Sequence, residues 1–136
     1  MSVPAGRYSS GGPFEEKFGY SRLVVAGPNA YVAGSTAVVG GIVNHEGDPY
    51  QQALTAFSVA LTALSEAGFG RADVVRTRMY VVHPRDMEEV GRAHKELFDG
   101  VRPAATMVVV SKLIDAQMLV EVELDAYRDG PRAGAR

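Results

Sequence analysis

The sequence predicts an α+β fold in which two helices cover one face of a mixed β-sheet. Two observations support this class. Apolar residues recur at helical spacing within residues 49–67 and 87–98, and several short segments around them are rich in β-branched residues. In chain order these segments give two or three strands, a helix, a strand, a helix and two strands, which is the order of a two-layer sandwich.

The first strands form a predicted hairpin. Residues 21–26 and 30–33 are β-branched and aromatic runs, and the turn-forming residues Gly27, Pro28 and Asn29 separate them. We expect the hairpin to end at Gly34. Residues 35–47 contain several glycines and predict a loop with at most a small strand.

The first helix is predicted from about residue 49 to residue 67. Asp48 suits the N-cap, Pro49 suits the first helical position, and Gly68 is a typical C-terminal stop. A predicted apolar stripe consists of Leu54, Phe57, Leu61 and Leu64, widened by Ala53, Ala56, Ala60 and Ala63.

A strand at residues 74–82 and a helix at residues 87–98 follow. Strict alternation would place Val75, Thr77, Met79 and Val81 on one face of the strand and Val74, Arg76, Arg78, Tyr80 and Val82 on the other. Along the helix, the predicted apolar side consists of Met87, Val90, His94 and Leu97.

The last two predicted strands differ in pattern. Residues 104–110 are apolar except for Thr106, which predicts a strand buried on both faces. Residues 117–127 alternate strictly between apolar and acidic side chains. Because both helices are expected on one side of the sheet, the other side needs a cover. We expect a second copy of the chain to supply it.

Length and composition restrict the possible classes of protein. The 136 residues fit one domain spanning 1–136, with a core from about 15 to 128 and flexible ends at 1–14 and 129–136. The net charge of −2 argues against a non-specific nucleic-acid binder. The absence of cysteine excludes disulfides and cysteine-ligated metals, and the three histidines form no metal-binding pattern. No apolar run reaches the roughly 18 residues of a membrane span.

Five segments, in this order, resemble the Rid family of YjgF-type reactive-intermediate deaminases. They are residues 19–21 with Gly27, residues 31–34, residues 61–77, residues 102–113 and residues 119–126. The fourth segment, RPAATMVVVSKL, is similar to the family signature P-A-R-S-x-V-E-V-x-x-L. The resemblance extends over about residues 18–128.

The resemblance implies a chorismate-mutase-like fold and a homotrimer with a central β-barrel and clefts between subunits. It also implies hydrolysis of reactive enamines and imines without a cofactor or metal. Glu121 matches the family's glutamate that orients the attacking water. The substrate-binding positions that the resemblance implies are Tyr20, Ala33, Gly34, Gly91, Ala105, Thr106 and Met107.

One position departs from the family pattern in a way that affects the substrate. The family's deaminases carry an arginine at the position of Ala105, where it clamps the substrate carboxylate, and alanine can neither carry charge nor donate a hydrogen bond. The sequence therefore indicates a branch without this clamp. Arg76, Arg78 and Arg102 are the candidates to replace it, and the sequence does not decide among them.

Two functions follow from this reading. The first is an enzyme that hydrolyses an enamine, an imine or a related reactive intermediate. The alternative is a non-catalytic trimer that binds a small molecule, which loss of the clamp would fit. The acids Glu121, Glu123 and Asp125 also have a simpler interpretation as the solvated face of an edge strand. We expect a cytoplasmic protein whose partners are a small-molecule substrate and its own copies, with no nucleic-acid or membrane partner.

Overall fold

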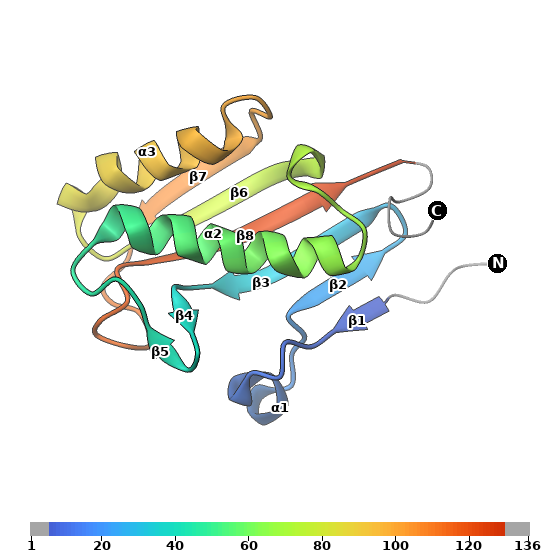
Figure 1. Cartoon of the computed structure of the whole chain (residues 1–136), viewed down its shortest axis with the longest axis horizontal. Coiled ribbons are helices and arrows are strands. Elements are labelled where there is room, and N and C mark those ends of the chain that lie inside the picture. The colour runs from blue at the N-terminus through green and yellow to red at the C-terminus, as the bar shows by residue number, and fades with distance from the viewer. Residues whose placement is uncertain (1–5, 130–136) are drawn as a thin grey trace.

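Two helices, α2 (Pro49–Glu66) and α3 (Met87–Phe98), cover one face of a six-stranded mixed sheet in the computed structural model, which describes residues 6–129 (Figure 1). The predicted α+β class is confirmed. The sheet strands are β1 (Gly6–Tyr8), β2 (Leu23–Ala26), β3 (Asn29–Ser35), β6 (Val74–Val81), β7 (Ala104–Val109) and β8 (Val120–Tyr127). The smaller elements are helix α1 (Pro13–Phe18), a hairpin of β4 (Val38–Val39) and β5 (Ile42–Val43), and 3₁₀ turns at Arg71–Asp73 and Pro84–Asp86.

The last strand of the chain lies inside the sheet, whose order is β1-β2-β3-β8-β6-β7. Only β6 and β7 pair in parallel, and helix α3 connects them. The predicted alternation of β8 is confirmed, because its apolar side chains are buried under the helices. Its acids Glu121, Glu123 and Asp125 therefore point to the uncovered side of the sheet, which we call the open face. Since β8 is not an edge strand, the edge-strand interpretation of these acids is wrong.

Helix α2 begins and ends close to the predicted positions. The Asp48 carboxylate accepts a hydrogen bond from the Gln51 amide at 3.0 Å, and Gly68 follows the helix with a left-handed φ of 83°. Its buried face, however, is made mainly of alanines, with Leu54 and Leu61 only half-buried. The small alanine side chains allow the helix axis to approach β3 and β8 closely.

A buried glutamine of α2 fixes the chain just before β8. The Gln52 side chain is fully buried, and it donates to the carbonyls of His45 at 3.2 Å and Gln117 at 2.9 Å. Its own oxygen accepts the Leu119 amide at 2.9 Å. All of its main hydrogen-bonding groups are thus satisfied, so this amide positions the start of β8 without the cost of a buried unpaired group.

Strand β6 departs from the predicted alternation at its first residues. The pairing of β6 with β8 shifts register between Val74 and Arg76, so Val74 is buried and Val75 is 49% exposed. The prediction that Val75 shares the face of Thr77 is therefore wrong. Such an irregularity inserts one residue into a strand and reverses the face of the residues before it.

Strand β7 is an edge strand, and the prediction that it is buried on both faces is wrong for the single chain. Most of its residues are exposed, including Val108 at 42% and Val109 at 47%, while Met107 is half-buried. An apolar edge strand leaves unpaired backbone groups beside apolar side chains, which is a surface that proteins usually cover.

The segment before residue 15 is more ordered than predicted. Within its described part, β1 pairs with β2 in antiparallel fashion, and α1 begins at Pro13. Strand β1 could not be predicted from its residues, because three residues are too few to show a period. The other predicted flexible stretches, residues 1–5 and most of 129–136, lie outside the described residues.

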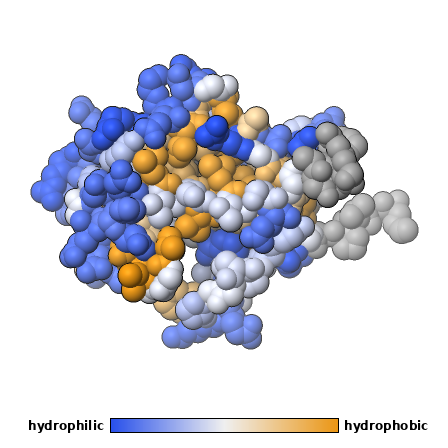
Figure 2. Space-filling view, viewed as in Figure 1, coloured by the Kyte–Doolittle hydropathy of each residue, from blue (hydrophilic) through white to orange (hydrophobic). Residues whose placement is uncertain are grey.

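On the helix side of the molecule, Figure 2 shows polar residues mainly around the periphery and apolar residues in two areas. One area crosses the middle of the view around helix α2, and the other lies over the β4–β5 hairpin, where Val39 is 52% and Ile42 is 65% exposed. Among the described residues, no helix is long and apolar enough to cross a membrane.

Candidate functional site

The centre of the candidate site is the contact between Glu121 and Gly34. Glu121 lies near the start of β8, and its side chain rests on Gly34 near the end of β3. A Cβ atom added at Gly34 would overlap the carboxylate Oε2 of Glu121 and come within 2.9 Å of its Cδ. Glycine at position 34 is therefore what allows the carboxylate to occupy this place.

The surroundings of Glu121 change its acidity. The side chain is half-buried, and burial is the main cause that raises the pKa of the Glu121 carboxyl above its ordinary value of 4.5. The neighbouring Glu123 carboxylate raises this pKa further, and the positive charge of Arg22 opposes both effects. A carboxyl group whose pKa is shifted toward neutrality is suited to exchange protons with a substrate or a water molecule.

Arg22 braces the end of β3 next to this carboxyl group. Its Nη1 donates to the carbonyl of Gly34 at 2.6 Å, to the carbonyl of Ala33 at 3.2 Å and to Ser35 Oγ at 3.1 Å. The Arg22 side chain is only 14% exposed. These bonds tie the residue before β2 to the irregular end of β3, where the pairing with β8 shifts register between Val32 and Ser35.

A buried acid in α1 holds Arg22 from the other side. Glu15 is 5% exposed and lies 3.8 Å from Arg22 Nε, and both its oxygens accept bonds from Ser10. Burial acts to raise the pKa of Glu15, but hydrogen bonds from Ser10 and Ser9 and the Arg22 charge together hold it below its ordinary value. Glu15 therefore stays ionised and partners Arg22.

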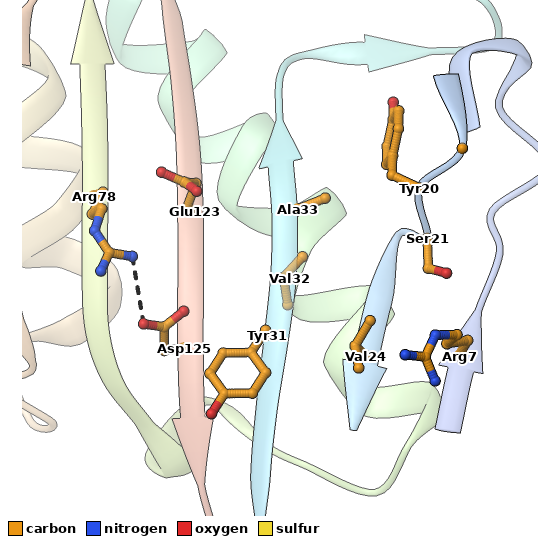
Figure 3. Close-up of a pocket in the computed structure, with 11 residues that line it drawn as sticks. Arg7, Tyr20, Ser21, Val24, Tyr31, Val32, Ala33, Arg78, Glu123 and Asp125 are labelled. Atoms are coloured by element: carbon orange, nitrogen blue, oxygen red, sulfur yellow. Dashed lines mark hydrogen bonds and ion pairs between the residues drawn. The ribbon is translucent and has the colours of Figure 1, made fainter. Parts of the chain in front are cut away.

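Tyr20 and Ala33 lie at a cavity of about 640 Å³ on the open face. Tyr20 is 41% exposed, and the Arg22 guanidinium lies 5.9 Å from its ring centroid. Figure 3 shows Tyr20 and Ala33 on neighbouring segments, with Glu123 of β8 further along the sheet. The structure thus brings four predicted site residues to the same end of strands β2, β3 and β8: Tyr20, Ala33, Gly34 and Glu121.

The other predicted site residues lie at the opposite edge of the sheet. Ala105 and Thr106 are exposed on the edge strand β7, and β6 separates them from β8. Gly91 on α3 lies close to Met107, whose Cε would be 4.0 Å from a Cβ at this glycine. Within one chain, these four residues are therefore not part of the group around Glu121.

The structure also places the arginines considered as replacements for the missing clamp. Arg102 is held by Asp99 through its Nε and Nη2, at 2.8 and 2.7 Å. Arg78 lies on the open face beside Thr106 and 3.4 Å from Asp125 (Figure 3). Arg76 is exposed, at the register position beside Ala104. The arginine whose positive charge acts on the Glu121 carboxyl is instead Arg22, which lowers its pKa.

Two further polar pairs involve side chains of β6, Tyr80 and Thr77. Tyr80 donates a hydrogen bond to Glu123 across the open face, and this bond is the main cause that raises the pKa of Tyr80. His94 lies on the helix side, with its Nε2 2.8 Å from Thr77 Oγ1. Burial lowers the pKa of His94, and its place between α2 and β6 gives it no access to Glu121. Among residues 6–129, no three His, Asp or Glu side chains are grouped so that they could hold a metal ion.

Sequence reasoning missed Arg22, Glu15 and Ser10. A weak signal existed for Arg22, which follows the family-like segment 19–21 directly. No pattern indicates that its side chain reaches backbone carbonyls 11 and 12 residues further along the chain.

Comparisons of this chain with known proteins all indicate the same family. Residues 14–128 match the family Ribonuc_L-PSP, described as endoribonuclease L-PSP. The chain is 52% identical to an uncharacterised protein of Streptomyces coelicolor, over 90% of this chain and 91% of that one. It is 30% identical to a RutC family protein of Pyrococcus abyssi, over 81% and 87%.

Solved structures agree with this result. The crystal structure of Rv2704 from Mycobacterium tuberculosis, described as a YjgF/YER057c/UK114 family member, superposes with a TM-score of 0.84 at 41% identity, covering 92% of this chain and all of that one. TdcF of E. coli, described with bound serine, gives 0.75 at 20% identity, over 90% and 94%. The second likeness concerns the fold alone.

Proposed function

Because the chain belongs to the YjgF/RutC/L-PSP (Rid) family, we propose that it hydrolyses a reactive enamine, imine or related small carbonyl intermediate. The observation that carries the proposal is the half-buried Glu121 carboxyl, held against Gly34 with its pKa raised by burial. Imine hydrolysis needs a group that takes a proton from water and later returns it, and a carboxyl group of this kind can do both.

The proposed reaction follows from the chemistry of the C=N bond. An enamine first tautomerises to the imine. Starting from the protonated imine, ionised Glu121 accepts a proton as a water oxygen bonds to the imine carbon, which gives a neutral carbinolamine. The protonated carboxyl then returns this proton to nitrogen. As the C–N bond breaks, the carboxylate accepts the hydroxyl proton of the carbinolamine, so the C=O bond forms and ammonia leaves. That last proton then passes to ammonia, which gives ammonium and restores the carboxylate. Tyr20, Ala33 and Gly34 would line the place of the substrate.

We propose that the working unit is a homotrimer in which the sheets form a central barrel. Two features support an assembly: no element within residues 6–129 covers the open face, and the edge strand β7 exposes Val108 and Val109. The proposed site residues also fall into two groups at opposite edges of the sheet. A neighbouring copy could place its β7 beside Tyr20. Its Ala105, Thr106 and Met107, with Gly91 behind Met107, would then lie next to the group around Glu121.

We further propose that the chain belongs to a branch of the family that does not depend on a substrate carboxylate. Ala105 carries no charge, and Arg102 is held by Asp99. Next to Gly34, Glu121 and Glu123 are both acidic and the donors of the nearby Arg22 bind the backbone, so this end of the open face favours neutral or protonated imines over carboxylates. No cofactor is part of the proposal, and its proposed setting is the cytoplasm.

The proposal is tested with a panel of imines generated in the assay, half carrying a carboxylate and half without it. We expect faster ammonia release from the uncharged imines in the presence of the protein than in its absence. A ligand that binds, as shown by a thermal shift, but is never converted would favour the alternative of a non-catalytic binding protein. No activity on any imine would contradict the proposed function.

Restoring the clamp gives a prediction about specificity. Ala105→Arg places an arginine on the exposed surface of β7, so the fold should tolerate it. A charge-assisted arginine–carboxylate bond contributes about 1.5–3 kcal/mol, so kcat/KM for carboxylate-bearing imines should rise by about 10- to 100-fold relative to uncharged ones. Ala104→Arg, which adds the same charge one residue earlier and on the other side of the strand, is the control. An equal rise in both variants would contradict the placement of residue 105 in the site.

The family description as an endoribonuclease does not lead us to propose RNA cleavage. The net charge of −2 gives no general attraction to phosphates. His94 is bonded to Thr77 on the helix side of the sheet, away from the open face. The described residues thus offer no paired histidines for acid–base cleavage of RNA.

A further inference from the structure

We propose that Arg22, held in place by Glu15, is a positioning residue that fixes both the location and the charge state of Glu121. The importance of this role for catalysis rests on the proposed function, whereas the effect of Arg22 on Glu121 does not depend on that function. Arg22 lies outside the signature segment at residues 102–113, and the proposed mechanism gives it no contact with the substrate.

The first step is the bond from Arg22 to the Gly34 carbonyl at 2.6 Å. The same nitrogen also reaches the Ala33 carbonyl and Ser35 Oγ, so one guanidinium group spans three consecutive residues of β3. Ser35 Oγ in turn donates to the Ala33 carbonyl at 3.0 Å. This network fixes the backbone where the ladder between β3 and β8 is irregular.

The second step is the position of Gly34 between Arg22 and Glu121. Arg22 binds its carbonyl, while the Glu121 carboxylate packs where a Cβ of Gly34 would lie. A shift of this peptide group therefore moves the surface on which the carboxylate rests. Arg22 thus controls the location of Glu121 through Gly34, without a direct contact to the carboxylate.

The third step is electrostatic. Besides Arg22, the charged or titratable groups near Glu121 are Glu123 on β8 and Tyr80 on β6. Burial and Glu123 disfavour the ionised form of Glu121, and Arg22 is the positive charge that favours it. Glu15 lies 3.8 Å from Arg22 and partly neutralises it. The Glu15–Arg22 pair therefore sets how strongly the site favours the carboxylate.

Arg22 does not serve as a substitute for the missing carboxylate clamp. Its side chain is 14% exposed, and its donors are directed at the protein backbone, Ser35 and Glu15. A clamp must present its donors to the ligand. The geometry points to a role in holding the site instead.

The test is the titration of the Glu121 carboxyl, followed by its side-chain ¹³C signal and assigned by the loss of that signal in Glu121→Gln. In Arg22→Gln the favourable charge is lost, so the pKa of Glu121 should rise. In Glu15→Gln the Arg22 charge is no longer offset, so the pKa should fall. Arg22→Lys keeps the charge and should leave the pKa close to that of the wild type.

A purely structural role of Arg22 would give a different result. Loosening of β3 would expose Glu121 to water, and its pKa would fall toward 4.5 in Arg22→Gln and Arg22→Lys alike. That result, or an unchanged pKa in Arg22→Gln, would overturn the proposal. If Arg22→Gln does not fold, Arg22→Lys still decides, because a fall in the pKa contradicts the proposal and an unchanged pKa supports it.

The titration separates this inference from the proposed function. If no imine is hydrolysed but the pKa values move in opposite directions, the function fails and the positioning role stands. If hydrolysis occurs, the acid limb of its pH profile should shift to higher pH in Arg22→Gln and to lower pH in Glu15→Gln. If kcat falls in Arg22→Gln while the acid limb of the pH profile stays at the same pH, Arg22 acts only on the structure.

Discussion

Glu121→Gln is expected to lower kcat/KM for imine hydrolysis by about 10²- to 10⁴-fold, which is the usual contribution of a general acid–base group. Glutamine keeps the size of the side chain and its packing against Gly34, but it cannot accept and return a proton. The measurement is ammonia release from the best imine of the panel. Activity within about threefold of the wild type would contradict the proposed mechanism.

Glu96→Gln provides the matched control for this variant. It makes the same chemical change on the exposed side of α3, where Glu96 accepts a hydrogen bond from Tyr50. We expect its activity to equal that of the wild type. A loss of similar size in both variants would show that the assay responds to net charge rather than to the site.

We expect Glu121→Gln to remain folded and as stable as the wild type, so that a loss of activity can be assigned to the lost carboxyl group. The pKa of Glu121 in the folded chain lies above its ordinary value of 4.5, so the folded state holds this proton more tightly than the unfolded state does. The stability that the residue contributes is therefore present below pH 4.5 and is lost as pH rises through the folded-state pKa. At pH 8 the glutamine variant should unfold at the same concentration of urea as the wild type or at a higher one.

The elements that the sequence predicted well are those with a long local pattern. Helix α2 has an N-cap at Asp48 and a stop at Gly68, and β8 alternates over its full length. These signals are local because they depend on the period of one segment against one apolar core. Helix α3 agrees for the same reason, since its predicted and observed bounds coincide.

The errors arose where the structure depends on neighbours that are distant in sequence. An apolar run such as residues 104–109 has the same sequence pattern whether the strand is buried by its own chain or by another molecule. The irregular pairing at Val75 depends on β8, which is some 50 residues further along the chain. Strand β1 exists because β2 offers it a free edge, and no feature of its three residues indicates this.

In the candidate site, too, the features with a local sequence pattern were predicted and those that depend on distant contacts were not. The position of Glu121 was predicted by alternation and by the family resemblance, and the open face confirms where its side chain points. The bracing by Arg22 could not be predicted, because a side chain that bonds to backbone carbonyls leaves no pattern in the residues it contacts. Only the folded chain shows that Gly34 connects the two.

Gly34→Ala is expected to cost about 100-fold in kcat/KM with little loss of stability. The new Cβ would overlap the carboxylate of Glu121, which is the flexible end of a side chain and can turn away at small cost. Gly34 does not have a positive φ, so alanine fits the backbone there. A displacement of about 1 Å at a catalytic group is enough for a loss of this size.

Three measurements make this expectation specific. The free energy of unfolding should change by less than about 1 kcal/mol, because the overlap is relieved at the surface of the site rather than in the core. The pKa of Glu121 should fall, since the displaced carboxyl enters water. Gly100→Ala is the control, because a Cβ there meets nothing within 4 Å, and it should leave both activity and pKa unchanged. Full activity in Gly34→Ala would show that the contact between Gly34 and Glu121 is not part of the catalytic arrangement.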